Sequence, residues 1–461
     1  MATLDFALDH STRQSIREDN KLRAEDHAAH DWYRFVLSFP PHLVRDYIDK
    51  FGADSNTRVL DPFCGTGTTL VECKKLGIPS VGIEAHPLAR FVSQVKVNWT
   101  VSPDALLKHA MEVAQLTSAK LEAEGIEDSE PTMFHNKNAA EVRLRTLPAH
   151  MLKMLLKDSI SPLPLHKTLA LLETLDEHKD STLWRHERLA LAKALVFKVS
   201  NLNFGPEVGV GHPKLDAPVL AEWVKGIRTM SDDLRHLQRE NGTKANIYLA
   251  DSRSPADVLK PKSVDFVITS PPYPNEKDYT RTTRLETVLL GLIQNKQEMR
   301  SLKKTMVRSN TRGVYKSDQD DLLVARNEKI NCIADAIEKR RIELGKTSGF
   351  ERLYARVTKL YFGGMARHLS ELRPLLRPGA QLAYVLGDQA SYLRVMIRTG
   401  QLLAEIATSL GYEITGIDLF RTRLATATKE QLREEVVLLR WGGVARKSVY
   451  YEKGANLRFD N

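Results

Sequence analysis

Ser270, Pro271, Pro272 and Tyr273 form the stretch of this 461-residue chain that is best suited to chemistry. They follow an apolar run at 264–268, which predicts a buried parallel strand whose carboxyl end opens into a rigid turn. Consecutive prolines fix φ and supply no N–H donors, so their carbonyls and the serine hydroxyl are left to accept hydrogen bonds. The tyrosine offers a flat face beside them. Such a turn suits a planar group with an exocyclic NH2, although a loop that only ends a strand is the plain alternative.

A second motif lies at 58–70, where a short apolar strand leads into a glycine-rich turn and the start of a helix. Gly65 and Gly67 let a ligand approach the backbone closely, because they carry no Cβ. Thr68 or Thr69 is expected to cap the helix, whose N-terminus favours a carboxylate or a phosphate. The motif therefore predicts a ligand-binding turn at the carboxyl end of a strand.

An acidic residue ends the next strand along the chain. The apolar run at 80–83 stops at Glu84, where a carboxylate is placed to accept hydrogen bonds from ribose hydroxyls. Strand, glycine-rich turn, helix and acidic strand end together predict a nucleoside-binding βαβ unit. A P-loop is excluded, because no Gly-Lys-Ser or Gly-Lys-Thr follows the glycines.

Together the two motifs resemble those of the DNA amino-methyltransferases, which use S-adenosylmethionine. The resemblance is closest to the cytosine-N4 group, which carries Ser-Pro-Pro-Tyr, whereas the adenine-N6 group more often begins with Asp or Asn. It covers residues 33–100 and 245–290, with a weaker stretch at 372–441. It implies an α/β fold of the class I methyltransferase type, a Rossmann-like, seven-stranded, mostly parallel sheet with large, mainly helical insertions. The cofactor motif precedes the catalytic motif, so the chain is permuted relative to several of these enzymes.

The resemblance also implies which residues contact the cofactor. Phe63 and the two glycines line its methionine part, Glu84 holds the ribose, and Asp251 lies where the family binds the adenine amino group. Helix capping by Asp251 and core packing by Phe39 are the alternatives. The full set of expected cofactor residues is Phe39, Asp61, Phe63, Gly65, Gly67, Thr68, Thr69, Glu84, Asp251 and Ser270.

The expected catalytic residues are Ser270, Pro271, Pro272 and Tyr273, and their role follows from the chemistry of an amino group on a base. Its lone pair is delocalised into the ring, so acceptors such as the Ser270 hydroxyl and the Pro271 carbonyl must hold it while it attacks the sulfonium methyl. Tyr273 stacks on the base, which is flipped out of the duplex. No Cys follows the prolines, which argues against methylation of cytosine C5. We expect a site-specific cytosine-N4 DNA methyltransferase. An adenine-N6 DNA enzyme, an RNA or protein-glutamine methyltransferase and a non-catalytic DNA-binding subunit are the alternatives.

Composition indicates the setting of the protein. The net charge of +9 favours a polyanionic partner, here double-stranded DNA. The three cysteines, Cys64, Cys73 and Cys332, do not have metal-ligand spacing, so we expect a reduced compartment and no metal. There is no apolar run of membrane-spanning length and no secretory signal. We expect a cytoplasmic prokaryotic protein that associates with the nucleoid through DNA, with a cognate restriction endonuclease or another defence-system subunit as its partner.

Strand and helix patterns divide the chain into six parts. These are an N-terminal arm (1–30), a cofactor-binding part (31–101), a helical insertion (102–243), a catalytic part (244–290), a basic insertion (291–350) and a C-terminal part (351–461). A charged helix is expected at 318–344. Both insertions are expected to form walls of a DNA cleft. The residues expected to contact DNA are Asn275, Arg281, Lys303, Lys304, Arg308 and Arg312, although local ion pairs or a solvated loop would also account for them.

Overall fold

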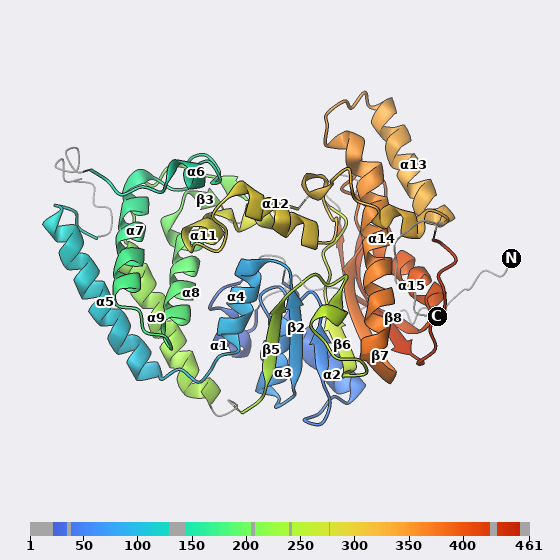
Figure 1. Ribbon diagram of the computed structural model, residues 1–461, viewed down its shortest axis with the longest axis horizontal. Helices are drawn as coiled ribbons and strands as arrows, with labels where there is room; N and C mark the ends of the chain where they lie inside the picture. Colours follow the sequence, from blue (N-terminus) through green and yellow to red (C-terminus); the bar gives the residue numbers. More distant parts are fainter. Residues whose placement is uncertain are drawn as a thin grey trace.

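A seven-stranded sheet forms the centre of the protein (Figure 1). The computed structural model describes residues 22–34, 38–128, 143–203, 208–238, 242–275, 277–424 and 431–451. The strands of the sheet, in spatial order, are β5 (Ala245–Leu249), β2 (Ser80–Glu84), β1 (Val59–Asp61), β6 (Val264–Thr269), β7 (Leu376–Gly387), β9 (Gln431–Trp441) and β8 (Tyr412–Leu424). Strand β9 runs in the direction opposite to that of the other six strands of this sheet. The expected class I methyltransferase fold is confirmed, and β8 and β9 form a terminal hairpin at one end of its sheet.

The strand order reverses between β1 and β6, and this reversal positions the two sequence motifs. The two strands pair in parallel, with Val59 opposite Phe266 and Leu60 opposite Val267. Their carboxyl ends therefore meet at one edge, where Asp61 starts the glycine-rich turn. In open α/β sheets, ligands bind in the crevice outside the strand ends at such a switch point. The topology thus brings both motifs to the usual ligand-binding position.

Helices cover both faces of the sheet, and the alternation of side chains along each strand decides which residues they meet. Along β7, Leu382 and Tyr384 pack with α14 (Tyr354–Leu372) and α15 (Thr399–Ser409), whereas Ala383 packs with α2 (Pro41–Phe51). Successive strand residues point to opposite faces, so one apolar run supplies both cores. The helices that follow β1 and β2 are α3 (Thr68–Lys75) and α4 (Pro87–Lys96).

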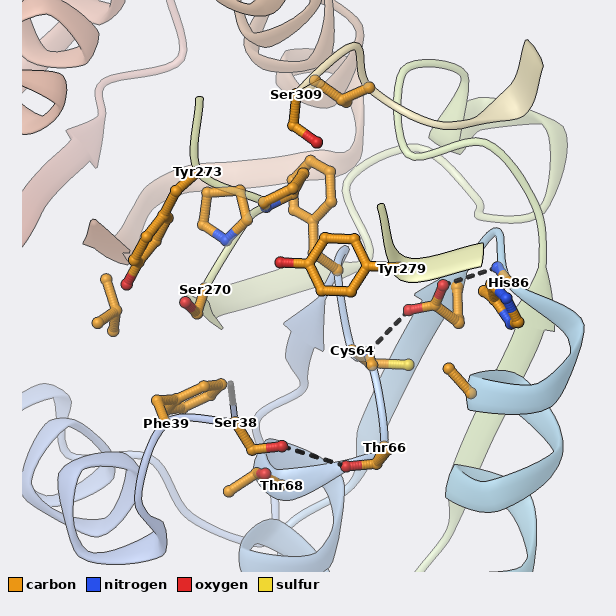
Figure 2. Close-up of a pocket in the computed structure, with 18 of the residues that line it drawn as sticks. Ser38, Phe39, Cys64, Thr66, Thr68, His86, Ser270, Tyr273, Tyr279 and Ser309 are labelled. Atoms are coloured by element: carbon orange, nitrogen blue, oxygen red, sulfur yellow. Dashed lines mark hydrogen bonds between the residues drawn. The ribbon is translucent and has the colours of Figure 1, made fainter. Parts of the chain in front are cut away.

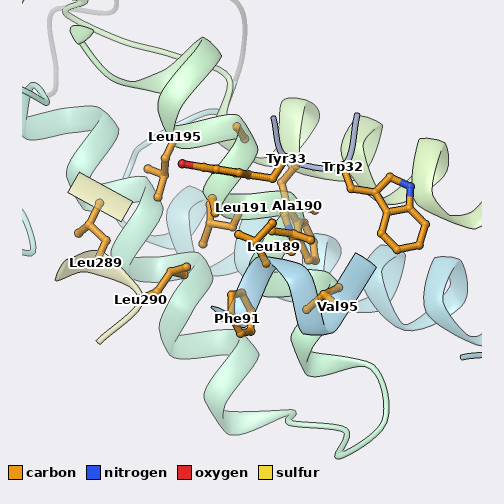
Figure 3. Close-up of a cluster of buried hydrophobic side chains, with 14 of the residues drawn as sticks. Trp32, Tyr33, Phe91, Val95, Leu189, Ala190, Leu191, Leu195, Leu289 and Leu290 are labelled. Carbon is orange, nitrogen blue, oxygen red and sulfur yellow. The ribbon is translucent and has the colours of Figure 1, made fainter. Parts of the chain in front are cut away.

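The region expected as a helical insertion folds into a layer beside the sheet (Figure 1). It comprises α5 (Pro103–Ala123), α6 (Ala149–Leu152), α7 (Pro162–Glu177), α8 (Trp184–Ala194), a π-helical turn (Leu195–Val199), the short strands β3 (Leu202–Asn203) and β4 (Gly209–Val210), and α9 (Val219–Leu237). Leu189 and Leu191 of α8 share one apolar cluster with Phe91 and Val95 of α4 (Figure 3). The layer is therefore anchored on the helix that follows β2.

The residues after the catalytic turn form α10 (Tyr279–Thr282), α11 (Arg284–Leu289), α12 (Lys296–Thr305) and α13 (Glu328–Glu343). The charged helix expected at 318–344 is broken. A 3-10 turn, Asp320–Val324, precedes α13, and the side chain of Asn327 caps α13 by accepting from the Ile330 N–H at 3.0 Å. The cause is packing against α14. A Cβ on Gly363 would lie 1.7 Å from the Asp320 carbonyl oxygen, so the turn sits directly on that helix backbone.

The described part of the N-terminal arm packs against the sheet helices, and residues 1–21 lie outside the described residues. Asp26 and His30 are buried. Asp26 pairs with Arg45 at 2.7 Å, and His30 contacts Glu72 at 2.7 Å. Arg45 also pairs with Glu72, so one network joins the arm to α2 and α3. None of the described helices combines the length and apolarity that crossing a membrane requires.

Candidate active site

A cavity of about 380 Å³ lies at the carboxyl edge of the sheet, and both sequence motifs line it (Figure 2). Cavities of several hundred Å³ with mixed apolar and polar walls are typical of small-molecule sites. The residues expected at the site that line it are Phe39, Phe63, Gly65, Thr68, Glu84, Ser270, Pro271, Pro272 and Tyr273. Four expected cofactor residues lie outside the lining: Asp61, Gly67, Thr69 and Asp251.

Glu84 is held in a fixed orientation by the backbone on either side of it. Its Oε2 accepts the Gly65 N–H at 2.8 Å, and its Oε1 accepts the His86 N–H at 2.7 Å. Burial raises the pKa of Glu84 to about 7, and these backbone bonds oppose that rise. A carboxylate oxygen can accept a second hydrogen bond, so the fixed group retains capacity for the two hydroxyls of a ribose.

Asp61 acts behind the cavity wall, where it ties the two motifs together. Its Oδ1 accepts the Thr269 hydroxyl at 2.6 Å and the Phe63 N–H at 3.1 Å. Thr69 donates to the Ile268 carbonyl at 3.2 Å, which makes a second link between the turn and β6. Burial raises the pKa of Asp61 to about 6. Both residues therefore hold the glycine-rich turn against β6.

The two glycines of the turn have different roles. Gly65 lines the cavity, and the nearest atom to a Cβ built there is 4.0 Å away, so its backbone is open to a ligand. Gly67 has φ of +87°, and its Cβ would lie 2.8 Å from the Ser93 Cβ. Close packing on α4, rather than ligand approach, requires a glycine there. The expected threonine cap was wrong, because Gly67 is the N-cap and α3 begins at Thr68 without a side-chain cap.

Asp251 is committed to an ion pair. It accepts from Arg253 Nε at 3.0 Å and Nη2 at 2.7 Å. Arg253 also pairs with Asp320 at 2.7 Å, which fastens the turn after β5 to the basic insertion. The next residue, Ser252, lines the cavity, and its carbonyl contacts His368 Nδ1 at 2.7 Å. The loop after β5 thus meets the cavity through Ser252, with Asp251 behind it.

The catalytic turn is held by contacts from two other segments. A Cβ on Gly387, at the end of β7, would lie 2.9 Å from Cε2 of Tyr273, so the glycine makes room for the tyrosine ring. The Asn275 N–H is shared between the carbonyls of Tyr273, at 2.8 Å, and Ser309, at 2.9 Å. Ser270 and Tyr273 point into the same space, with Phe39 below them (Figure 2). The turn can therefore present acceptors and an aromatic ring to one ligand.

Several lining residues were missed from the sequence. They are Tyr33, Ser38, Thr66, His86, Tyr279, Thr305, Met306, Val307, Ser309, Gln389, Phe420, Arg421 and Glu434. Tyr279 could have been noticed in the sequence, because Asp278 before it is a residue type typical of a helix N-cap. Asp278 accepts the Thr280 N–H at 3.0 Å at the start of α10. Burial and the nearby Glu84 raise the pKa of Tyr279 to about 12, so it stays neutral beside that carboxylate.

The cations expected to contact DNA differ in whether they are paired with a carboxylate of the protein or exposed at its surface. Lys303 pairs with Asp278 at 2.9 Å, and the buried Arg308 pairs with Asp318 at 2.8 Å, so both have protein partners. Lys304 is exposed, with its Nζ 5.8 Å from the centre of the Tyr315 ring.

Of the other residues expected to contact DNA, Arg312 is exposed and Arg281 is partly exposed. Asn275 lines the cavity. The segment 305–309 itself forms a cavity wall, so the basic insertion contributes to the site as well as to the surface.

Comparison with known proteins shows which proteins the chain is similar to. A model of N6 and N4 methyltransferases, described as DNA methylase, matches residues 11–90. The chain is 26% identical over 456 residues to the type II methyltransferase M.BsoBI of Geobacillus stearothermophilus, a match that covers 90% of this chain and 85% of that protein. It is 24% identical over 430 residues to the type II methyltransferase M.AvaI of Anabaena variabilis, covering 87% and 82%. The matched model and these relatives support a DNA amino-methyltransferase family for this chain. Members of this family use S-adenosylmethionine, so this is its cofactor.

The residues of this amino-methyltransferase fit that cofactor. The fixed carboxylate of Glu84 suits a ribose, and the open backbone at Gly65 admits a ligand beside it. Thr68 starts α3 at the cavity wall, where helix N–H groups favour a carboxylate such as that of the methionine part. Phe39 and Phe63 supply apolar walls.

Proposed function

We propose that this DNA methyltransferase transfers a methyl group from S-adenosylmethionine to N4 of cytosine. One observation carries the proposal: the acceptor turn at Ser270 and Tyr273 lines the same cavity as Gly65 and Glu84. The donor and a flat amino-bearing ring would therefore meet in one enclosed space. Ser270 in the first position of the turn favours cytosine, because the cytosine-N4 group of the family carries Ser there.

The chain's residues supply positioning and hydrogen-bond acceptors. When bound, the cofactor supplies a methyl group activated by its sulfonium charge. The Ser270 hydroxyl and the Pro271 carbonyl accept hydrogens of the target NH2, which draws its nitrogen toward sp3 geometry and frees its lone pair. Tyr273 stacks on the ring and fixes its plane. Holding the two reactants in this geometry supplies most of the rate enhancement.

A covalent route through a thiol is disfavoured by the state of Cys64, which also lines the cavity. Burial raises the pKa of this thiol well above its usual value, so it stays protonated. Its Sγ packs against β2, where a Cβ on Gly82 would lie 2.8 Å away. A nucleophilic cysteine needs the thiolate form, so Cys64 is a packing residue.

The substrate of the proposed reaction is double-stranded DNA. A base amino group inside the duplex cannot reach a cavity at the sheet edge, so the target must be flipped out, at a cost of a few kcal/mol. Lys304 and Arg312 are exposed beside the cavity wall at 305–309 and are the proposed phosphate contacts. The type II methyltransferases among the relatives support a role in restriction–modification. We propose in addition that a cognate endonuclease is its partner and that it associates with the nucleoid through DNA.

Adenine N6 is the second candidate, because the same acceptors can hold its amino group. The test is to incubate purified protein with plasmid DNA and methyl-labelled cofactor, then to digest the DNA and identify the nucleoside by mass spectrometry. N4-methyldeoxycytidine is the expected product, and N6-methyldeoxyadenosine would establish the second candidate instead. Methylation-aware sequencing of the same DNA gives the recognition sequence. Wild-type protein that binds the cofactor but methylates neither base would refute both.

Two variants test whether the turn that contains Ser270 and Tyr273 takes part in methyl transfer. Ser270→Ala removes one acceptor and Tyr273→Ala removes the stacking face, so both should lower methyl transfer by at least tenfold while cofactor affinity stays near wild type. Calorimetry with the cofactor alone is the control for folding. Full activity in Ser270→Ala would remove this hydroxyl from the proposed mechanism.

A further inference from the structure

The strands β7, β9 and β8 lie beyond β1 and β6 from β2, the strand that ends in Glu84, and they also contribute side chains to the cavity lining. Gly387 lies opposite Glu434, and Glu434 lies opposite Arg421, in the register of these three strands. Residues in register on neighbouring strands share one face of a sheet. The row therefore places a glycine, a carboxylate and a guanidinium side by side, and the ring of Tyr273 occupies the space left by the glycine.

A β-bulge in β8 brings Arg421 to the cavity. The register with β9 shifts between Leu419 and Arg421, so one extra residue is inserted there. Consecutive strand residues ordinarily point to opposite faces, yet both Phe420 and Arg421 line the cavity. Bulges re-aim side chains beside active sites. This bulge directs the Arg421 side chain into the cavity, beside Glu434.

Arg421 is anchored in a way that leaves its outer donors available. Its Nε donates to Oε2 of Glu434, and the two side chains are 21% and 12% exposed. Its guanidinium carbon lies 5.8 Å from the centre of the Phe420 ring. Across the part of the chain that the structure describes, no hydrogen bond uses Nη1 or Nη2 of Arg421. The fork is thus fixed at one edge and presents two parallel N–H groups at the other.

Two parallel donors match the hydrogen-bonding edge of cytosine better than that of adenine. Beside its amino group, cytosine carries two neighbouring acceptors, N3 and O2. Adenine carries one acceptor, N1, followed by a C–H. A flipped base is read by hydrogen bonds to this edge, and a good bidentate pair is worth roughly 1–3 kcal/mol of discrimination.

We propose that Arg421, held by Glu434, is a specificity-determining residue that donates to N3 and O2 of the flipped cytosine while Ser270 accepts from its amino group. The inference rests on the proposed function and names the residue that selects the base. It predicts that the contribution of Arg421 to the methylation rate depends on the two parallel donors of its guanidinium and on N3 of the base, rather than on its charge alone.

The test compares two DNA duplexes that carry either cytosine or 3-deazacytosine, in which a C–H replaces N3, at the target position of the identified site. Single-turnover methylation rates are measured for wild type, Arg421→Met, Arg421→Lys and Arg440→Met. Arg440 is an exposed arginine on β9 outside the cavity lining and serves as the matched control. Cofactor affinity is measured for every variant to verify the fold.

We expect Arg421→Met to lower the rate on cytosine by roughly tenfold to a hundredfold. Arg421→Lys should not restore it, and Arg440→Met should resemble wild type. The ratio of the cytosine rate to the 3-deazacytosine rate should be about tenfold larger for wild type than for Arg421→Met. Comparing the two ratios cancels the intrinsic effect of the analogue on reactivity, because that effect is the same for both proteins. If Arg421→Met fails to bind cofactor, Glu434→Gln gives the same comparison, with a smaller reduction of that ratio expected.

A wild-type rate in Arg421→Lys would overturn the proposal in favour of a simple charge contact with phosphate. Equal ratios in wild type and Arg421→Met would overturn it too. Failure of the proposed function is a separate outcome, because N6-methyldeoxyadenosine would then be the product of the wild-type enzyme before any variant is compared.

Discussion

Cofactor binding should weaken steeply with acid, because the carboxylate expected to hold the ribose has a raised pKa. Burial raises the pKa of Glu84 to about 7, and only the ionised form offers both oxygens as acceptors. If the protonated form does not bind, the Kd rises in proportion to one plus the ratio of protonated to ionised enzyme. With a pKa of about 7, the Kd at pH 5.5 is then about twenty-five times the Kd at pH 7.5.

The neighbouring groups define the controls. Burial lowers the pKa of His86 to about 4, so it stays neutral throughout this range. Burial raises the pKa of Asp61 to about 6, so its titration contributes at the acid end, and Asp61→Asn separates that contribution. Glu84→Gln should bind the cofactor more weakly at pH 7.5, by about tenfold or more, since hydrogen bonds to a charged group are lost. Its affinity should also become nearly independent of pH.

Calorimetric titration of the protein with S-adenosylmethionine, without DNA, at pH values from 5.5 to 7.5 measures these affinities. Circular dichroism at each pH verifies that the protein remains folded. A wild-type affinity that is constant over this range would refute the assignment of the raised pKa to the ribose-binding carboxylate. An unchanged pH dependence in Glu84→Gln would refute it as well, and would direct attention to Asp61.

Three further perturbations test the positions of single residues. Gly387→Ala should push the Tyr273 ring away, because the new Cβ would lie 2.9 Å from its Cε2. Methylation rates should fall by about tenfold to a hundredfold at unchanged cofactor affinity, and an unchanged rate would mean that the ring position is not critical. Gly67→Ala should lower the free energy of unfolding in urea by about 1–3 kcal/mol, because of its positive φ and the contact with Ser93; intact stability with lost cofactor affinity would restore a ligand-contact role. Lys304→Ala should lower the slope of log affinity for DNA against log salt by about one, and an identical slope would exclude a phosphate contact.

The strands and turns that form the candidate site could be predicted from the sequence alone. The turn at Ser270 and the turn at Gly65 each follow a short apolar strand, and the acidic end of β2 is equally visible at Glu84. These signals are local, because strand alternation, fixed proline φ and glycine turns depend on a few adjacent residues. The seven-stranded, mostly parallel sheet was implied by the family resemblance that these motifs carry.

Only the tertiary structure decided which polar residues remain available to ligands. Asp251 is paired with Arg253, which is also bound to Asp320, 67 residues away. Lys303 is paired with Asp278 across 25 residues. A charged side chain looks the same in sequence whether its partner is water or a distant carboxylate. Folding decides, because pairing compensates for the loss of hydration on burial.

The cavity residues of the terminal hairpin could not be predicted from the sequence for the same reason. Arg421 and Glu434 belong to strands that begin more than a hundred residues after the catalytic turn, and a bulge rather than regular alternation directs Arg421 inward. Gly67 gives the converse case, since its glycine is required by Ser93 on a neighbouring helix and not by the ligand. Register shifts and helix contacts are set by packing between elements. Residue spacing therefore determined which turns form the candidate site, whereas packing determined which side chains line its cavity.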